Sequence, residues 1–200
     1  MNEFDLNKVR DSTLIYIIGT NKYTLIKDIL INKKHLPMVV FNLTEEFNDI
    51  IPHHANIHKS YSSDKILKLV KDQRLNNNKT LLLIDDCPHT IYKDKSIRDI
   101  FMNCGNLKLL TILTSRDLHS IDPILRSNID YIYIFSGCTM IDLKKIYSYY
   151  GNIFNTFEEF HEVYIRETEN NRCIVFNLLS ISENIIDNVF WYEPKNMLDL

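Results

Sequence analysis

Glycine and proline are scarce in this chain, whose 200 residues include only four glycines and five prolines. A chain so poor in both is not of the Pro/Gly-rich kind that stays disordered. The same scarcity counts against any site that needs a loop of several glycines. Long apolar runs are missing too: the longest, such as Leu14–Ile18 and Tyr131–Phe135, are far too short to span a bilayer.

Cysteine pairs and an excess of positive charge are also missing. The four cysteines, Cys87, Cys104, Cys138 and Cys173, lie far apart and form no CxxC pair. Scattered thiols without a signal peptide favour a reducing, intracellular compartment and argue against zinc ligation. The net charge is −3, so a contact with DNA would need a local basic patch.

The residues that are present suit one α/β domain over residues 1–200, because an apolar fraction of 45% can bury a full core. Short apolar runs predict strands at Thr13–Ile18, Met38–Phe41, Thr80–Ile84, Leu109–Thr114, Tyr131–Phe135, Cys173–Leu178 and Asn188–Tyr192. Helical spacing and capping residues predict helices at Lys22–Asn32, Ser63–Gln73, Ser96–Asn103, Asp122–Ser127, Thr139–Tyr150 and from Thr156 to about Arg166. This alternation predicts a mostly parallel sheet with helices on both faces, and late strands within 173–192 at the sheet edge.

Two helix ends carry specific signals. Gly151 follows the helix Thr139–Tyr150 and is a good residue for the position just after a helix. The run Thr156-Phe157-Glu158-Glu159 matches a capping box, in which the first side chain and the fourth satisfy each other's backbone N–H groups.

The strand Thr80–Ile84 runs straight into two carboxylates, Asp85 and Asp86. P-loop NTPases end their magnesium-holding strand, the Walker B element, in this way. Carboxylates at the carboxyl end of a strand also lie where open α/β sheets place their ligands. Asp85 would then hold Mg²⁺, and Asp86 would orient or deprotonate the attacking water. The alternative is a solvated strand end, since Asp commonly begins a turn.

A candidate phosphate loop lies upstream, at Gly19, Thr20, Asn21, Lys22, Tyr23 and Thr24. The motif G-x-x-x-x-G-K-[ST] cradles phosphates with backbone N–H groups, and its lysine and hydroxyl contact phosphate oxygens and magnesium. Aligning Lys22 with the motif lysine puts Tyr16 at the first glycine, Asn21 at the second and Tyr23 at the hydroxyl.

Each replacement in this loop weakens the prediction of a nucleotide site. Asn21 tolerates left-handed backbone, yet its side chain would crowd a phosphate. The phenol of Tyr23 lies too far from the backbone to replace a short hydroxyl on Mg²⁺, and Thr24 would do so only after a register shift. The alternative is that Gly19–Thr24 is an ordinary turn between a strand and a helix.

Two arginines and three histidines are weaker candidates. Arg116 follows the strand Leu109–Thr114 and offers a fork of donors for phosphate, or is a surface residue. Arg126 would reach a neighbouring subunit's nucleotide as an arginine finger, or cap a turn. The histidines match no zinc spacing, and we expect them in a surface loop: His53, His54 and His58.

Several ordered motifs carry a resemblance to a known family. They are Leu81-Leu82-Leu83-Ile84-Asp85-Asp86-Cys87 with Arg98-Asp99-Ile100-Phe101-Met102-Asn103, then Ile112-Leu113-Thr114, Pro123-Ile124-Leu125-Arg126-Ser127-Asn128-Ile129-Asp130-Tyr131 and Val189-Phe190-Trp191-Tyr192, together with the helix Thr24-Leu25-Ile26-Lys27-Asp28-Ile29-Leu30. From about Ser12 to Pro194 the chain resembles the genome-packaging ATPases of poxviruses and other nucleocytoplasmic large DNA viruses, which are FtsK/HerA-class P-loop motors.

The resemblance implies a RecA-like P-loop NTPase core that works as a homo-oligomeric ring, binds ATP and Mg²⁺ between subunits and moves viral double-stranded DNA into a preformed capsid. It implies capsid proteins as partners, and the viral factory of the host cytoplasm or the virion as location. On this resemblance Lys22 and Thr24 match the phosphate loop, Asp85 and Asp86 match Walker B, and Arg126 matches the arginine of the R-[AS]-N motif.

The chain also departs from that family. The usual Asn-Gly-Arg-His is Asn103-Cys104-Gly105-Asn106 here, and the sensor glutamine is Arg116 or absent. Each lost electrostatic group typically lowers a rate by about 10²–10³, although such losses need not add. Two hypotheses follow: a DNA-packaging ATPase homologue with weakened or lost hydrolysis, or a catalytically inactive structural or regulatory relative that acts through protein–protein contacts.

Overall fold

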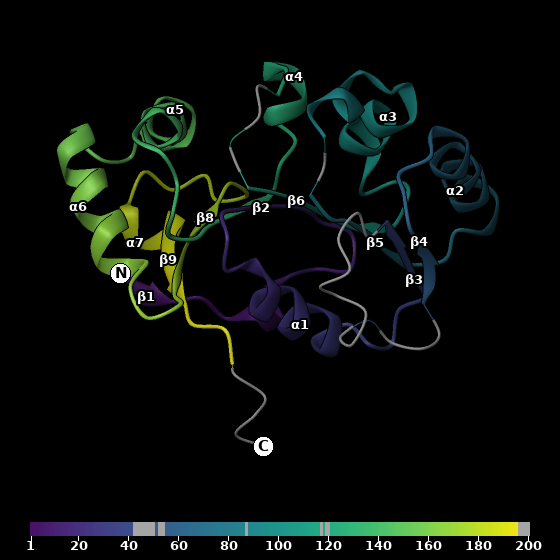
Figure 1. The fold of residues 1–200 in the computed structure, drawn as a ribbon, viewed down its shortest axis with the longest axis horizontal. Helices are drawn as coiled ribbons and strands as arrows, with labels where there is room; N and C mark the ends of the chain where they lie inside the picture. Colours follow the sequence, from purple (N-terminus) through teal and green to yellow (C-terminus); the bar gives the residue numbers. More distant parts are fainter. Residues whose placement is uncertain (42–50, 52–54, 87, 117, 119–120, 196–200) are drawn as a thin grey trace.

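The computed structural model describes residues 1–41, 51, 55–86, 88–116, 118 and 121–195 (Figure 1). The predictions made for His53, His54 and Cys87 lie outside these residues. Within them, no helix combines the length and apolar character needed to cross a membrane.

The described residues form one nine-stranded sheet in the order β1-β9-β8-β7-β2-β6-β5-β3-β4. The strands are β1 (Asn2–Glu3), β2 (Leu14–Ile18), β3 (Met38–Phe41), β4 (Asn56–His58), β5 (Thr80–Ile84), β6 (Leu109–Ser115), β7 (Tyr131–Ile134), β8 (Cys173–Asn177) and β9 (Val189–Tyr192). Strand β8 pairs antiparallel with β7 and with β9, and the other pairs are parallel. The predicted mostly parallel α/β sheet is confirmed.

Helices cover both faces of this sheet, with α1 on one face and α2 to α5 on the other (Figure 1). The α-helices are α1 (Lys22–Asn32), α2 (Ser63–Asn76), α3 (Lys95–Asn103), α4 (Pro123–Arg126), α5 (Met140–Tyr150), α6 (Phe157–Glu167) and α7 (Ile185–Asn188). Two 3₁₀ turns, η1 (Leu6–Lys8) and η3 (His89–Lys93), complete the set in the described residues.

Strand β2 shows how the two faces divide the core. All five of its residues are buried, as expected for a central parallel strand. Because side chains alternate along a strand, Leu14, Tyr16 and Ile18 join the cluster under α2–α6, whereas Ile15 and Ile17 join the cluster under α1.

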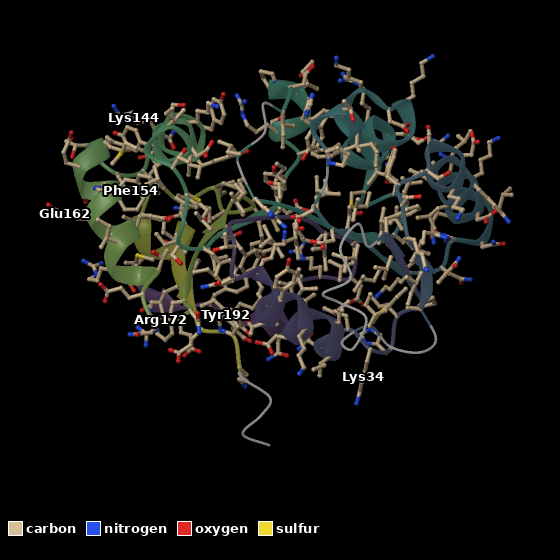
Figure 2. The ribbon with its side chains drawn as sticks, in the orientation of Figure 1. Lys34, Lys144, Phe154, Glu162, Arg172 and Tyr192 are labelled. Atoms are coloured by element: carbon tan, nitrogen blue, oxygen red, sulfur yellow. The ribbon has the colours of Figure 1, made fainter. Side chains whose placement is uncertain are left out.

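Many charged side chains lie at the outside of the molecule, while aromatic ones lie between the helices and the sheet. Figure 2 shows Lys34, Lys144 and Glu162 at the outside of the molecule. Phe154 is buried and packs against Phe160 of α6. Buried apolar side chains therefore lie between the helices and the sheet on both of its faces.

The start of α6 and the end of α5 each differ in one detail from the prediction. Thr156 accepts from the Glu159 N–H at 3.1 Å, as a capping box requires, but the Glu159 carboxylate accepts from the Asn155 N–H instead. Gly151 has φ −89°, so its backbone is not left-handed. A Cβ there would lie 2.7 Å from the Tyr147 ring, so close packing is what requires glycine.

The sheet edges hold the elements that were not predicted. Strands β1 and β4 are only two and three residues long, too short for a periodic signal. The late strands β8 and β9 lie toward one side of the sheet, and β1 pairs outside β9 at that side. The four-residue helix α7 directly precedes β9.

Candidate functional site

The side chains of Asp85 and Thr114 meet because strand alternation puts both on the α1 face. In β5, Leu81 and Leu83 point to that face, and in β6, Leu110 and Ile112 do. Two residues further on, Asp85 and Thr114 follow the same alternation. The Thr114 hydroxyl donates to Asp85 Oδ1 at 2.6 Å, and the Asp85 carboxylate is fully buried.

Lys22 reaches these carboxylates from the other layer. It begins α1, and Ile26 and Ile29 follow at positions four and seven residues later, on the same helix face. That face packs on the sheet, so Lys22 is only 1% exposed. Its position in the first turn brings the ammonium to the carboxyl ends of the strands, where ligands of open α/β sheets lie.

The ammonium of Lys22 contacts both carboxylates. Its Nζ donates to Asp86 Oδ1 and lies 3.4 Å from Asp85 Oδ1. On the solvent side, Arg116 Nε lies 3.3 Å from Asp86 Oδ2. Two positive groups therefore face two negative groups, and the cluster is balanced in charge without any bound ligand.

Asp86 has an unusual backbone conformation, with φ at +42°. A non-glycine residue in the left-handed region is uncommon and is held there by its surroundings. The Asp86 N–H donates to Thr114 Oγ1 at 3.0 Å, so one hydroxyl holds both acidic residues. The turned backbone is what lets Asp86, as well as Asp85, face Lys22.

The candidate phosphate loop is short. Only Gly19, Thr20 and Asn21 separate the end of β2 from Lys22, whereas six residues precede the lysine in the phosphate-loop motif. The alignment of Tyr16 with the first glycine is wrong in structural terms, because Tyr16 lies inside β2 and is fully buried. Residues 16–18 pair with β6 and β7 in the sheet.

Gly19 is fixed by two contacts with neighbouring strands. Its N–H donates to the Ser115 carbonyl at 3.1 Å, so this donor is not turned toward a ligand. Its φ is +116°, and a Cβ would lie 2.8 Å from Phe135 Cβ. Glycine is therefore required here for a tight exit from β2 rather than for the approach of a phosphate.

The remaining loop residues make contacts outside the Lys22–Asp85–Asp86 cluster or beside it. Thr20 and Asn21 are exposed, and the Asn21 amide donates to Asn171 Oδ1 at 3.1 Å. The Thr24 hydroxyl makes a long 3.5 Å contact with the Asn21 carbonyl. The Tyr23 ring lies 5.6 Å from Lys22 Nζ.

Arg126 is not part of the Lys22 cluster. Its guanidinium stacks on the Tyr149 ring of α5, 3.6 Å from the centroid, and donates to the Ile121 carbonyl at 3.2 Å. These contacts within the chain correspond to the turn-capping alternative. Its predicted role toward a neighbouring subunit stays a prediction.

From the sequence, no bonding role was predicted for three polar residues near the site, Thr114, Tyr16 and Ser115. Thr114 holds both acidic residues, and on the opposite face the Tyr16 hydroxyl and Ser115 Oγ are 2.7 Å apart. A signal existed: these are the polar groups at the centre and end of otherwise apolar strands. A polar group in a buried strand needs a partner.

A shallow cleft of about 580 Å³ lies beside the loop. It is bounded by Asn21, the segment 136–138 after β7, α5, α6 and the turn 168–171. Asn170 and Asn171 have left-handed backbones, and Asn171 binds Asn21 across the rim of the cleft. This hydrogen bond connects the loop to the opposite wall of the cleft.

Two features of the site work against a bound magnesium–nucleotide complex. Oxygen ligands such as Asp85 and Asp86 are those that Mg²⁺ prefers, but the Lys22 ammonium already occupies their shared side. No group of three or more His, Cys, Asp or Glu residues that would hold a metal is present in the described part of the chain. The Gly19 N–H is bonded to the Ser115 carbonyl and only three residues precede Lys22 after β2, so this arrangement does not fit a magnesium–nucleotide complex.

Relatives of this chain occur in large DNA viruses. The uncharacterized protein 075L of Invertebrate iridescent virus 6 is 32% identical over 207 residues, which cover 96% of this chain and 78% of 075L. The chain belongs to the 075L family. Protein L437 of Acanthamoeba polyphaga mimivirus is 28% identical over 218 residues, covering 97% of this chain and 77% of L437. No family model matches the sequence.

The solved structures that resemble this member of the 075L family are P-loop ATPases. The genome packaging NTPase B204 of Sulfolobus turreted icosahedral virus 2, in complex with AMPPCP, superposes with a TM-score of 0.67 at 16% identity, over 94% of this chain and 100% of B204. ATPases 2 and 3 of EssC from Geobacillus thermodenitrificans give 0.60 at 14% identity, over 92% of this chain and 40% of EssC. The predicted α/β fold is confirmed, and it is the fold of these NTPases.

Proposed function

We propose that this member of the 075L family is a subunit of a viral DNA-packaging machine, in which ATP hydrolysis is weakened or lost. One observation carries the proposal: on a packaging-NTPase fold, Lys22 meets Asp85 and Asp86 at the carboxyl ends of the central strands. Relatives in iridescent viruses and mimivirus support a role shared among large DNA viruses. The corresponding partners are copies of the same chain in a ring, viral double-stranded DNA and capsid proteins.

Weakened hydrolysis follows from the loop. Residues 16–18 belong to β2, and the Gly19 N–H is used by Ser115. A phosphate chain needs a cradle of free N–H groups at a helix N-terminus, and here only three residues, Gly19 to Asn21, separate β2 from α1. The proposed single domain over residues 1–200 would then act in the viral factory or in the virion.

Removing the protein from infected cells tests its role. Silencing or deleting the gene should give particles that assemble but contain no genome, counted by electron microscopy and by DNA quantification of purified particles. Restoring the wild-type gene should restore filled particles. Normal filling without the protein would refute a packaging role.

A second candidate is an inactive structural or regulatory subunit, which the short loop and the internally neutralised carboxylates favour. Complementation with Asp86→Asn separates the two, because this change removes the proposed catalytic carboxylate and keeps its shape. Empty particles would indicate hydrolysis, and filled particles would indicate a role through protein–protein contacts. The matched control is Asp64→Asn, an exposed carboxylate in the first turn of α2.

Nucleotide binding is a separate test in purified protein. We expect weak or absent binding of Mg-ATP by calorimetry, and no gain from Asn21→Gly with Tyr23→Ser, since two substitutions do not lengthen a three-residue loop. Micromolar affinity in the wild type would show that the loop opens.

A further inference from the structure

The Lys22 cluster is built like a metal site whose metal has been replaced by a side chain. Lys22 and Asp85 are almost completely buried, at 1% and 0% exposure, and Asp86 is 17% exposed at its side chain. Lysine is almost never fully buried unless it is paired, and Lys22 contacts two carboxylates at once. The arrangement is one central cation with two oxygen ligands.

We propose that the Lys22 ammonium is the resident cation of the Asp85–Asp86 pair, so that the pair becomes a divalent-cation site only when Lys22 is removed. The proposal rests on the carboxylate site of the proposed function, but it is independent of DNA packaging. In this role Lys22 keeps a divalent ion out of the site, whereas the lysine of a phosphate loop helps to bind the ligand.

Charge and space both support this assignment. Lys22 and Arg116 balance Asp85 and Asp86, so an added divalent ion would leave the cluster with excess positive charge. A Mg²⁺ ion would sit about 2.0–2.1 Å from its oxygen ligands, and the ammonium already contacts Asp86 Oδ1. Asp85 Oδ1 in turn accepts from Thr114 at 2.6 Å.

Removing the ammonium would leave two carboxylates side by side in a buried setting. Breaking a buried ion pair is strongly destabilising because the remaining charge has no compensation. A divalent ion would replace the lost positive charge beside Asp85 and Asp86, and it matches their ligand type, since hard cations bind carboxylate oxygens. The empty volume of the lysine side chain gives the ion an approach.

The experiment compares Mn²⁺ binding and thermal unfolding of the purified wild type and Lys22→Ala. We expect no Mn²⁺ binding by the wild type in electron paramagnetic resonance, and no change in its unfolding midpoint. In Lys22→Ala, the midpoint should fall by about 10 °C without metal, and millimolar Mn²⁺ should restore most of the loss. Lys22→Ala/Asp86→Asn should show no such recovery, because one ligand is gone.

The matched control is Lys33→Ala, which removes the other buried lysine at the far end of the same helix. Lys33 faces the single carboxylate of Asp11 and the Val9 carbonyl, so Mn²⁺ should not rescue this variant. If Lys22→Ala does not fold without metal, refolding of Lys22→Ser in Mn²⁺ decides the matter, because serine also leaves space for the ion. Failure of both variants to gain stability from Mn²⁺, or equal Mn²⁺ binding by the wild type, would overturn the proposal while leaving the packaging test unaffected.

Discussion

The two ends of helix α1 each bury a lysine against a carboxylate, but only one end resembles a ligand site. At the first turn, Lys22 contacts Asp85 and Asp86, which follow the central strand β5. At the last turn, Lys33 donates to the Val9 carbonyl at 2.6 Å and to Asp11 at 3.0 Å. A buried lysine–carboxylate contact is therefore no sign of function by itself.

The backbone and the position in the sheet make the difference. Asp86 has a left-handed backbone, and its N–H and the Asp85 carboxylate are held by one threonine hydroxyl. Asp11 instead lies before β2 and forms a second ion pair with the exposed Lys79. Backbone strain at Asp86 and convergence at the carboxyl ends of parallel strands distinguish the first cluster, since open α/β sheets bind their ligands at this position.

The largest expected effect is that of Asp85→Ala at the first turn. It leaves Lys22 buried with only Asp86, and it removes the acceptor of the Thr114 hydroxyl. We expect a loss of about 4–5 kcal/mol in the free energy of unfolding, measured by urea denaturation. The matched variant at the far end of α1 is Asp11→Ala. If Asp85→Ala loses no more unfolding free energy than Asp11→Ala, the two ends of α1 do not differ in stability.

Lys33→Ala tests the last turn. It deletes the donor to the Val9 carbonyl and to Asp11, and we expect a loss of about 3 kcal/mol by the same measurement. Lys33→Met, which keeps the apolar stem, should recover part of that loss. An unchanged stability in Lys33→Ala would mean that Lys79 alone compensates Asp11.

The pH dependence of stability isolates Asp11. Burial raises its pKa, but hydrogen bonds from Lys79 and Lys33 outweigh burial and lower it from 3.8 to about 2. A carboxyl whose pKa falls on folding stabilises the fold above its ordinary pKa, and the contribution is lost as the pH falls from about 4 to about 2.

That contribution is about 2 kcal/mol at neutral pH. It is read as the difference in unfolding free energy between wild type and Asp11→Asn. The difference should shrink as the pH falls from about 4 to about 2. A constant difference across this range would contradict the assigned pKa shift.

The smallest expected effect is that of Arg116→Ala at the rim of the first cluster. Its side chain is 64% exposed, so solvent screens its contact with Asp86. We expect a change below about 1 kcal/mol, decreasing further with added salt. A larger, salt-independent loss would place Arg116 inside the buried network.

The sequence predicted Lys22 at the first turn of α1 and the two carboxylates after β5, but it did not predict that Lys22 contacts both carboxylates. The apolar run before Asp85 and the helical spacing of α1 predicted β5 and α1 with their observed bounds. The alignment with Tyr16 failed because a motif counts residues, whereas the length of β2 decides where the loop begins. The contact of Thr114 with Asp85 was not predicted because the two residues are 29 positions apart in the sequence.

The sheet edges were harder to predict than its centre. The fully buried strands carry continuous apolar runs, a signal that acts within a few residues. The order of β8, β9 and β1 depends on pairing between the two ends of the chain, which no local pattern encodes. The same limit applies to Arg126, whose contact with Tyr149 arises only when α4 and α5 pack on the same face.

The sequence by itself determined the alternation of strands and helices, the two carboxylates after β5 and the lysine at the start of α1, because these depend on short-range periodicity and residue type. Only the tertiary structure decided that the loop has three residues and that Lys22 contacts both Asp85 and Asp86. The physical reason is strand pairing. Strand β6 lies between β2 and β5, and this order brings residues more than 60 positions apart in the sequence together at the carboxyl ends of the central strands.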